Sequence, residues 1–137
     1  MSFYASTEEL NKVMQLLWQS IKDDKSMSDK LIASKLVVQF HYREPESFMV
    51  VDCSDGQNMN IKAGEPHPKP IVEMSMKADT AHEFWLGKLS IPVALITGKI
   101  VSKGPTPKAL ALLPVIKPAF DIYPKVLDQV RSSQSAS

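Results

Sequence analysis

The sequence has 137 residues, of which 44% are hydrophobic and 23% charged, and a formal net charge of +1. A chain of this size is expected to form one domain, residues 1–137, that buries about two thirds of its unfolded surface. It has no apolar run near the roughly 18 residues of a membrane-spanning helix, and its single cysteine, Cys53, permits no internal disulfide, which excludes membrane-spanning and disulfide-rich classes.

The basic residues are concentrated in the C-terminal part of the chain. Residues 1–86 carry 9 Lys/Arg and 13 Asp/Glu, whereas residues 87–137 carry 7 and 2. Such an asymmetry can direct a surface toward anionic lipid headgroups or nucleic acid, and the alternative is an ordinary solvated face. Because these basic residues are dispersed, with little aromatic interleaving, nucleic acid is not an expected partner.

Two helices are predicted at the start of the chain. Ser6 and Glu9 form a capping box, and apolar residues then recur at helical spacing as far as Asp23-Asp24. A shorter helix is expected over residues 27–34.

Four strands with period-two alternation follow. They are predicted over residues 36–42, 48–53, 58–63 and 72–77. An Asp55-Gly56 turn is the favoured two-residue hairpin signal, so the second and third strands should be antiparallel neighbours. Each strand is expected to have one apolar and one polar face.

The next segment contains two short helices and a fifth strand. Asp79 is the predicted N-cap of a helix that stops at Gly87, and a second helix is expected over residues 91–97. A strand over residues 99–103 then ends at Gly104.

Prolines characterise the remainder of the chain. After a helical segment over residues 108–113, Pro114, Pro118 and Pro124 are expected to divide the tail into short pieces, with residues 132–137 frayed. Since a sheet with one apolar face needs helices to cover it, the predicted class is α+β, with a five-stranded, mostly antiparallel sheet covered on one face by helices.

Four of the seven methionines, Met49, Met59, Met74 and Met76, occupy strand positions where β-branched residues are more usual. Flexible methionine side chains suit an adaptable wall around a variable guest, but they also serve as ordinary core filler. Both interpretations remain open at this point.

An ordered set of residues resembles the signature of the sterol carrier protein type-two lipid-transfer family. The set is Asp79, Phe84-Trp85, Gly87-Lys88-Leu89, Pro92, Ala94, Gly98-Lys99-Ile100 and Gly104. Weaker similarity extends to Val51-Asp52, to Asp55-Gly56 and to residues 108–113.

The resemblance implies an apolar tunnel between sheet and helices that holds fatty acyl chains, fatty acyl-CoA, phospholipid or sterol, with no catalytic residue and no cofactor. Ser102 departs from the family, which usually has an aliphatic residue there. The candidate lipid-binding residues are Met49, Val51, Met59, Ile61, Met74, Met76, Phe84, Leu89, Ala94, Leu95, Ile100, Ser102 and Phe120.

The tail around Phe120 is a candidate lid that opens at an anionic membrane, with Lys117, Lys125 and Arg131 facing outward. The alternative is a static helix that closes the core. The chain shows neither a secretion signal nor a peroxisomal terminal tripeptide, so a cytoplasmic location is expected.

Catalytic and metal sites are not indicated. His41, His67 and His82 lack metal-ligand spacing, and Cys53 has no nearby basic activator, so it is expected to be an inert buried thiol. Two main hypotheses remain: a non-catalytic lipid carrier, or an interaction or lipid-sensing regulatory module with a filled core. An accessory subunit in lipid or quinone metabolism is a weaker third.

Overall fold

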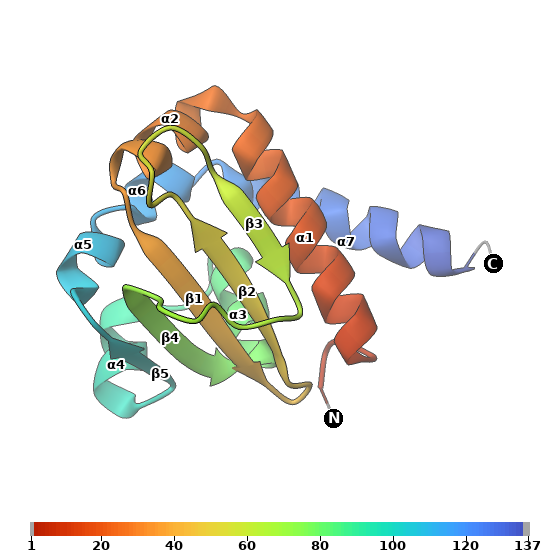
Figure 1. Ribbon diagram of the computed structural model, residues 1–137. Helices are drawn as coiled ribbons and strands as arrows, with labels where there is room; N and C mark the ends of the chain where they lie inside the picture. The colour runs from red at the N-terminus through yellow and green to blue at the C-terminus, as the bar shows by residue number, and fades with distance from the viewer. Residues whose placement is uncertain (1, 136–137) are drawn as a thin grey trace.

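A five-stranded mixed sheet forms the centre of the computed structural model, which describes residues 2–135 (Figure 1). The strands are β1 (Val37–Arg43), β2 (Ser47–Asp52), β3 (Asn60–Ala63), β4 (Val72–Lys77) and β5 (Ile100–Lys103). The helices are α1 (Thr7–Asp23), α2 (Lys25–Ala33), α3 (Ala78–Trp85), α4 (Ile91–Thr97), α5 (Thr106–Leu110), α6 (Leu113–Ile116) and α7 (Ala119–Ser135).

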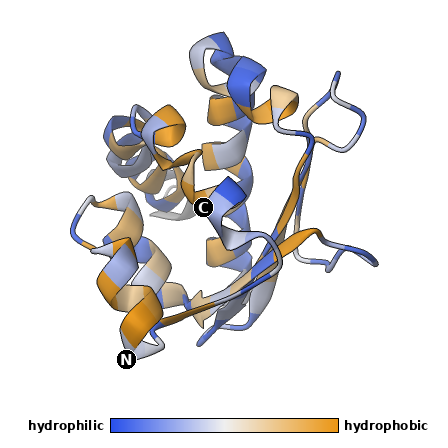
Figure 2. Cartoon of the chain, turned by 90° about the vertical axis from the view of Figure 1, so that its left-hand side faces the viewer, coloured by the Kyte–Doolittle hydropathy of each residue, from blue (hydrophilic) through white to orange (hydrophobic). Residues whose placement is uncertain are grey.

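The strand order is β3-β2-β1-β4-β5, and only the β1–β4 pairing is parallel. The parallel pair arises because the linker after β3 carries the chain back across the sheet, so that β4 starts at the same end as β1. Figure 2, in which the sheet is seen nearly edge-on, places the helices on one side of it. The predicted α+β class and mostly antiparallel sheet are therefore confirmed.

The linker of residues 64–71 covers part of the other face of the sheet, crossing β2 and β1 (Figure 1). The backbone N–H of His67 donates to Gln39 Oε1 at 2.7 Å, and Gln39 Nε2 donates to Glu73 Oε2 at 2.6 Å. Gln39 is consequently only 3% exposed. The expected polar face is thus only partly open to solvent.

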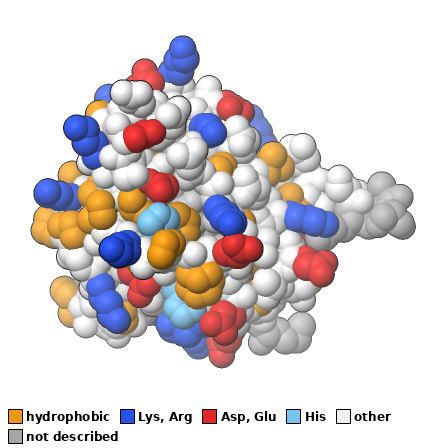
Figure 3. Space-filling model, viewed as in Figure 1, with side chains coloured by type: hydrophobic (Ala, Val, Ile, Leu, Met, Phe, Trp, Pro, Cys, Tyr) orange, Lys and Arg blue, Asp and Glu red, His pale blue; other side chains and the backbone are white. Residues whose placement is uncertain are grey.

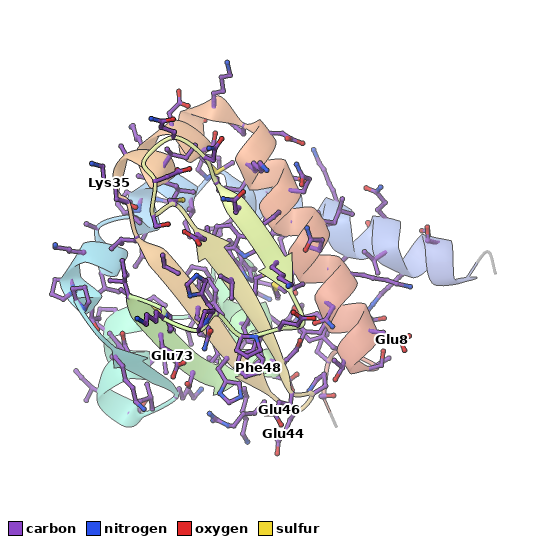
Figure 4. The ribbon with its side chains drawn as sticks, viewed as in Figure 1. Glu8, Lys35, Glu44, Glu46, Phe48 and Glu73 are labelled. Carbon is purple, nitrogen blue, oxygen red and sulfur yellow. The ribbon has the colours of Figure 1, made fainter. Side chains whose placement is uncertain are left out.

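Aromatic stacking also covers this face near the β1–β2 turn. The rings of His41 and Phe48 stack with their centroids 4.5 Å apart. Figure 4 shows Phe48 beside Glu46 and Glu44 of that turn, and His41 Nε2 lies 3.2 Å from Glu46 Oε1.

The helix-covered face holds the hydrophobic core. The stripe that predicted α1 is buried, with Leu10, Val13, Leu17 and Ile21 fully enclosed. Ser6 caps the helix as expected, since its side chain accepts from the N–H of Glu9 at 3.1 Å.

Two local predictions were wrong. Asp79 is not the N-cap of α3: the cap is Lys77, without a side-chain hydrogen bond, and the Asp79 carboxylate instead accepts from the N–H of Phe3 at 2.7 Å. The Asp55-Gly56 pair does not make a two-residue hairpin, because β3 begins only at Asn60. Asp55 Oδ1 accepts from the N–H groups of residues 57 and 58, which stabilises a longer loop.

The tail is also more regular than predicted. Pro114 and Pro118 lie near helix boundaries, but Pro124 lies inside α7, which runs on to Ser135. Burial of Tyr123, Val126 and Val130 offsets the backbone hydrogen bond that Pro124 removes. Residues 132–135 are helical rather than frayed, and residues 136 and 137 lie outside the described residues.

Candidate functional site: an apolar cavity between sheet and helices

A cavity lies between the helix-covered face of the sheet and the helices. Its volume is about 90 Å³. One water needs only about 10–15 Å³ by the same measure, so the cavity is several times larger than a water molecule but narrow. None of the described residues that line it is charged.

The sheet provides one wall and helices provide the other. Alternation along the strands directs Val38, Phe40 and Tyr42 of β1 to the cavity, together with Met74 and Met76 of β4. The helical wall comes from all the helices from α1 to α6. They contribute, in chain order, Trp18, Leu31, Phe84, Leu95, Ala109 and Ile116.

Six of the thirteen candidate residues line this cavity. They are Val51, Met74, Met76, Phe84, Leu95 and Ile100. Met49, Met59 and Ala94 are instead fully buried in the solid core, and Ile61 and Leu89 pack against that core at partial exposure. The role of all thirteen in lipid binding stays a prediction.

Ser102 and Phe120 also lie off the cavity wall. Ser102 faces the helices, because it pairs with Met74 across β4 and β5, but its Oγ lies 2.6 Å from Thr106 Oγ1. That hydrogen bond satisfies the hydroxyl. Phe120 packs edge-to-face against Phe84 and Trp85, with ring centroids 5.4 and 6.2 Å apart.

Several lining residues were not among the candidates. Val38, Phe40 and Tyr42 alternate along the strand predicted over residues 36–42, and this alternation selects them once it is known which face of the sheet the helices cover. Trp18 of α1 lines the cavity as well. Leu112 and Leu113, which line the opposite wall, carried no periodic signal because α5 and α6 are only one turn long.

Polar groups at the cavity wall are few. The Tyr42 hydroxyl lies 3.8 Å from Met14 Sδ, and burial raises the pKa of Tyr42. Burial also raises the pKa of the Cys53 thiol to about 11, with smaller contributions from Asp52 and Asp55. Trp18 is 4% exposed, and its Nε1 has no hydrogen-bond partner among the residues that the structure describes.

A polar cluster holds the C-terminal helix in place. The hydroxyls of Tyr4 and Tyr123 are hydrogen-bonded, and His82 Nδ1 lies 2.7 Å from the Tyr123 hydroxyl. Arg131 Nη2 donates to Glu9 Oε1 at 3.1 Å and its guanidinium lies over the Phe3 ring. The Arg131 side chain was predicted to face outward; it is 43% exposed and at the same time pairs with the buried Glu9.

Burial lowers the pKa of His82 in this cluster, and Arg131 acts in the same direction while Asp79 opposes it. These contacts connect α7 to the N-terminal segment, to α1 and to α3. A mobile lid in this part of the chain stays a prediction.

No three His, Cys, Asp or Glu side chains come together to hold a metal ion within residues 2–135. None of the helices in that range has both the length and the apolarity to cross a bilayer. The arrangement therefore defines an α+β domain with an uncharged apolar cavity between a mixed sheet and its covering helices.

Solved structures of sterol carrier proteins share this fold. The sterol carrier protein domain 2 of Helicoverpa armigera matches with a TM-score of 0.65 and 21% identity, over 88% of this chain and 95% of that one. Palmitated SCP2L2 from Aedes aegypti matches with a TM-score of 0.51 and 18% identity, over 75% and 93%. The chain has the sterol carrier protein fold, which confirms the resemblance predicted from residues 79–104.

A part of a larger enzyme matches as well. The sec-alkylsulfatase Pisa1 from a Pseudomonas species gives a TM-score of 0.55 at 14% identity, over 65% of this chain. This chain spans only 14% of the length of that sulfatase. Neither a protein-family model nor a curated protein matches the chain.

Proposed function

We propose that this protein is a non-catalytic lipid-binding and transfer protein that holds a hydrocarbon chain in the cavity. The observation that carries the proposal is the uncharged, apolar lining of a cavity of about 90 Å³ between the sheet and the helices. Ligand cavities of proteins are mostly apolar and commonly measure about 300–1,000 Å³, so the walls of this cavity have to move apart to admit a hydrocarbon chain. The palmitated state of a structural neighbour agrees with an acyl ligand.

The energy needed for binding can come from the hydrocarbon alone. Each methylene group removed from water contributes about 0.8 kcal/mol, so a chain of about fourteen carbons gains roughly 11 kcal/mol before ordering costs. Met74 and Met76 on the sheet wall have flexible side chains that can shift to widen the narrow space around a guest.

The unpaired Trp18 Nε1 refines the ligand class. A buried donor without a partner costs about 1–3 kcal/mol, and a ligand oxygen at this atom would recover part of it. Acyl lipids and sterols, which carry a carbonyl or hydroxyl oxygen, are therefore favoured over a plain alkane. A cytoplasmic location stays a prediction.

Native mass spectrometry of the purified protein tests the proposal. Copurified lipid, which a fluorescent fatty acid displaces at micromolar concentration, is the expected result. A clean apo mass with no uptake of fatty acid, acyl-CoA, phospholipid or sterol would instead favour the interaction or regulatory module with a filled core.

A further inference from the structure

Helix α4 is apolar on two opposite sides. Ile91 and Leu95 line the cavity and Ala94 is buried, yet Val93 is 56% exposed and Ile96 is 85% exposed. Val93 and Ile96 are three positions apart, so they lie on one face of the helix. A helix that is apolar all round is normally enclosed, whereas this one separates an apolar cavity from water.

The segment of the chain that contains α4 carries charged side chains of one sign. Residues 84–120 contain five lysines and no aspartate or glutamate. Lys88 lies three residues before α4 and Lys99 two residues after it. Both are exposed, and neither takes part in an ion pair within 4.0 Å in the described part of the chain. Figure 3 shows hydrophobic side chains interspersed with Lys and Arg at the left-hand edge, where α5, α4 and β5 lie in Figure 1.

We infer that the α4 patch, formed by Lys88, Val93, Ile96 and Lys99, docks on an anionic lipid bilayer. Val93 and Ile96 enter the boundary between headgroups and acyl chains, and the two lysines contact anionic headgroups. The lysines favour a bilayer over a second copy of the chain, because two such patches facing each other would bring like charges together.

Docking at this face also suggests a route for the lipid. Since α4 lies between the patch and the cavity, a small displacement of the helix would connect the cavity with the membrane interior. Gly87 and Gly98 flank α4 with positive φ angles of 75° and 79°, a region that only glycine adopts without strain, and they are suited to act as hinges. This route rests on the proposed lipid-carrier function, but the docking itself does not.

The test is sedimentation of the full chain with vesicles of phosphatidylcholine containing about one third phosphatidylserine. Ile96→Ser should lower the partition coefficient at least about tenfold, whereas Ile96→Leu should keep it. Lys99→Gln should lower it about fivefold. The matched control Lys30→Gln, which changes an exposed lysine on α2, should have no effect.

Equal partition of wild type and Ile96→Ser, or equal binding to vesicles of phosphatidylcholine alone, would overturn the docking. Dimerisation in analytical ultracentrifugation that Ile96→Ser abolishes, without vesicle binding, would also overturn it in favour of a second copy. Because Ile96 is mostly exposed and does not line the cavity, its variants should fold and bind fluorescent fatty acid in solution as the wild type does. Failure of the wild type to bind that fatty acid would instead contradict the proposed function.

Discussion

A larger side chain on α3 that fills part of the cavity should raise the free energy of unfolding and weaken lipid binding. Ala81 is buried and lines the cavity, whereas Ala78, on the same helix, is fully buried in solid core away from it. Ala81→Leu adds three carbon atoms to a side chain that adjoins empty space. Ala78→Leu adds the same three atoms at a position that has no empty space beside it, and it serves as the matched control.

The added atoms should exclude about three methylene groups of the ligand. At about 0.8 kcal/mol each, the loss is roughly 2.4 kcal/mol, or about a 60-fold rise in the Kd for a fatty acid. The free energy of unfolding should rise by about 0.5–2 kcal/mol in Ala81→Leu, because cavity filling adds buried contacts. Overpacking should lower it by about 1–3 kcal/mol in Ala78→Leu, with little change in lipid affinity.

Urea unfolding and displacement of a fluorescent fatty acid measure the two quantities. If both variants lose stability equally and neither changes lipid affinity, the space beside Ala81 is not a ligand site and the reasoning is refuted.

Three further predictions concern backbone strain, pH and thiol reactivity. Gly98→Ala should lower the free energy of unfolding by about 1 kcal/mol, because alanine is strained at this positive φ. Gly104→Ala should lower it more, because φ is positive there too and the added Cβ would clash with the backbone carbonyl oxygen of Ile71. Equal losses of stability in urea unfolding would contradict this difference. Burial lowers the pKa of His82 in the folded protein, so His82 takes up a proton at a higher pH in the unfolded chain than in the folded one. The free energy of unfolding should therefore fall as the pH drops below about 6.5. His82→Gln should show a shallower dependence in denaturation curves between about pH 5 and 7, and an unchanged slope would exclude His82 as its source. Cys53, with a pKa of about 11, should react with iodoacetamide at pH 8 at least about 100-fold more slowly in the native protein than in urea, and equal rates would show that the thiol is accessible.

The parts of the fold that could be predicted from the sequence are those with local signals. The capped helix after Ser6 and the alternation of Leu36, Val38, Phe40 and Tyr42 depend on neighbouring residues, and both were located within a residue or two. The ordered set of residues between Asp79 and Gly104 predicted the fold through its resemblance to a known family, and each of its three glycines adopts a positive φ that other residues avoid.

The remainder depends on contacts between distant residues. The carboxylate of Asp79 accepts a hydrogen bond from the N–H of Phe3, 76 positions away. The residues next to Asp79 in the sequence give no sign of this contact, so they could not rule out a capping role. Likewise, Met49 and Met74 both face the helices, but only the three-dimensional arrangement decides that the first meets solid core and the second meets a cavity. The continuity of α7 through Pro124 depends on packing against α1 in the same way.

The proposed lipid-carrier function places an acyl chain in the space between β4, β5 and α4. The most direct measurement is an isotope-filtered NOE spectrum of the labelled protein with unlabelled palmitate. Cross-peaks from the acyl methylene protons to the methyl groups of Met74, Met76, Leu95 and Ile100 are the predicted result. Cross-peaks only to exposed side chains such as Ile71 and Val101, or none at saturating palmitate, would contradict it.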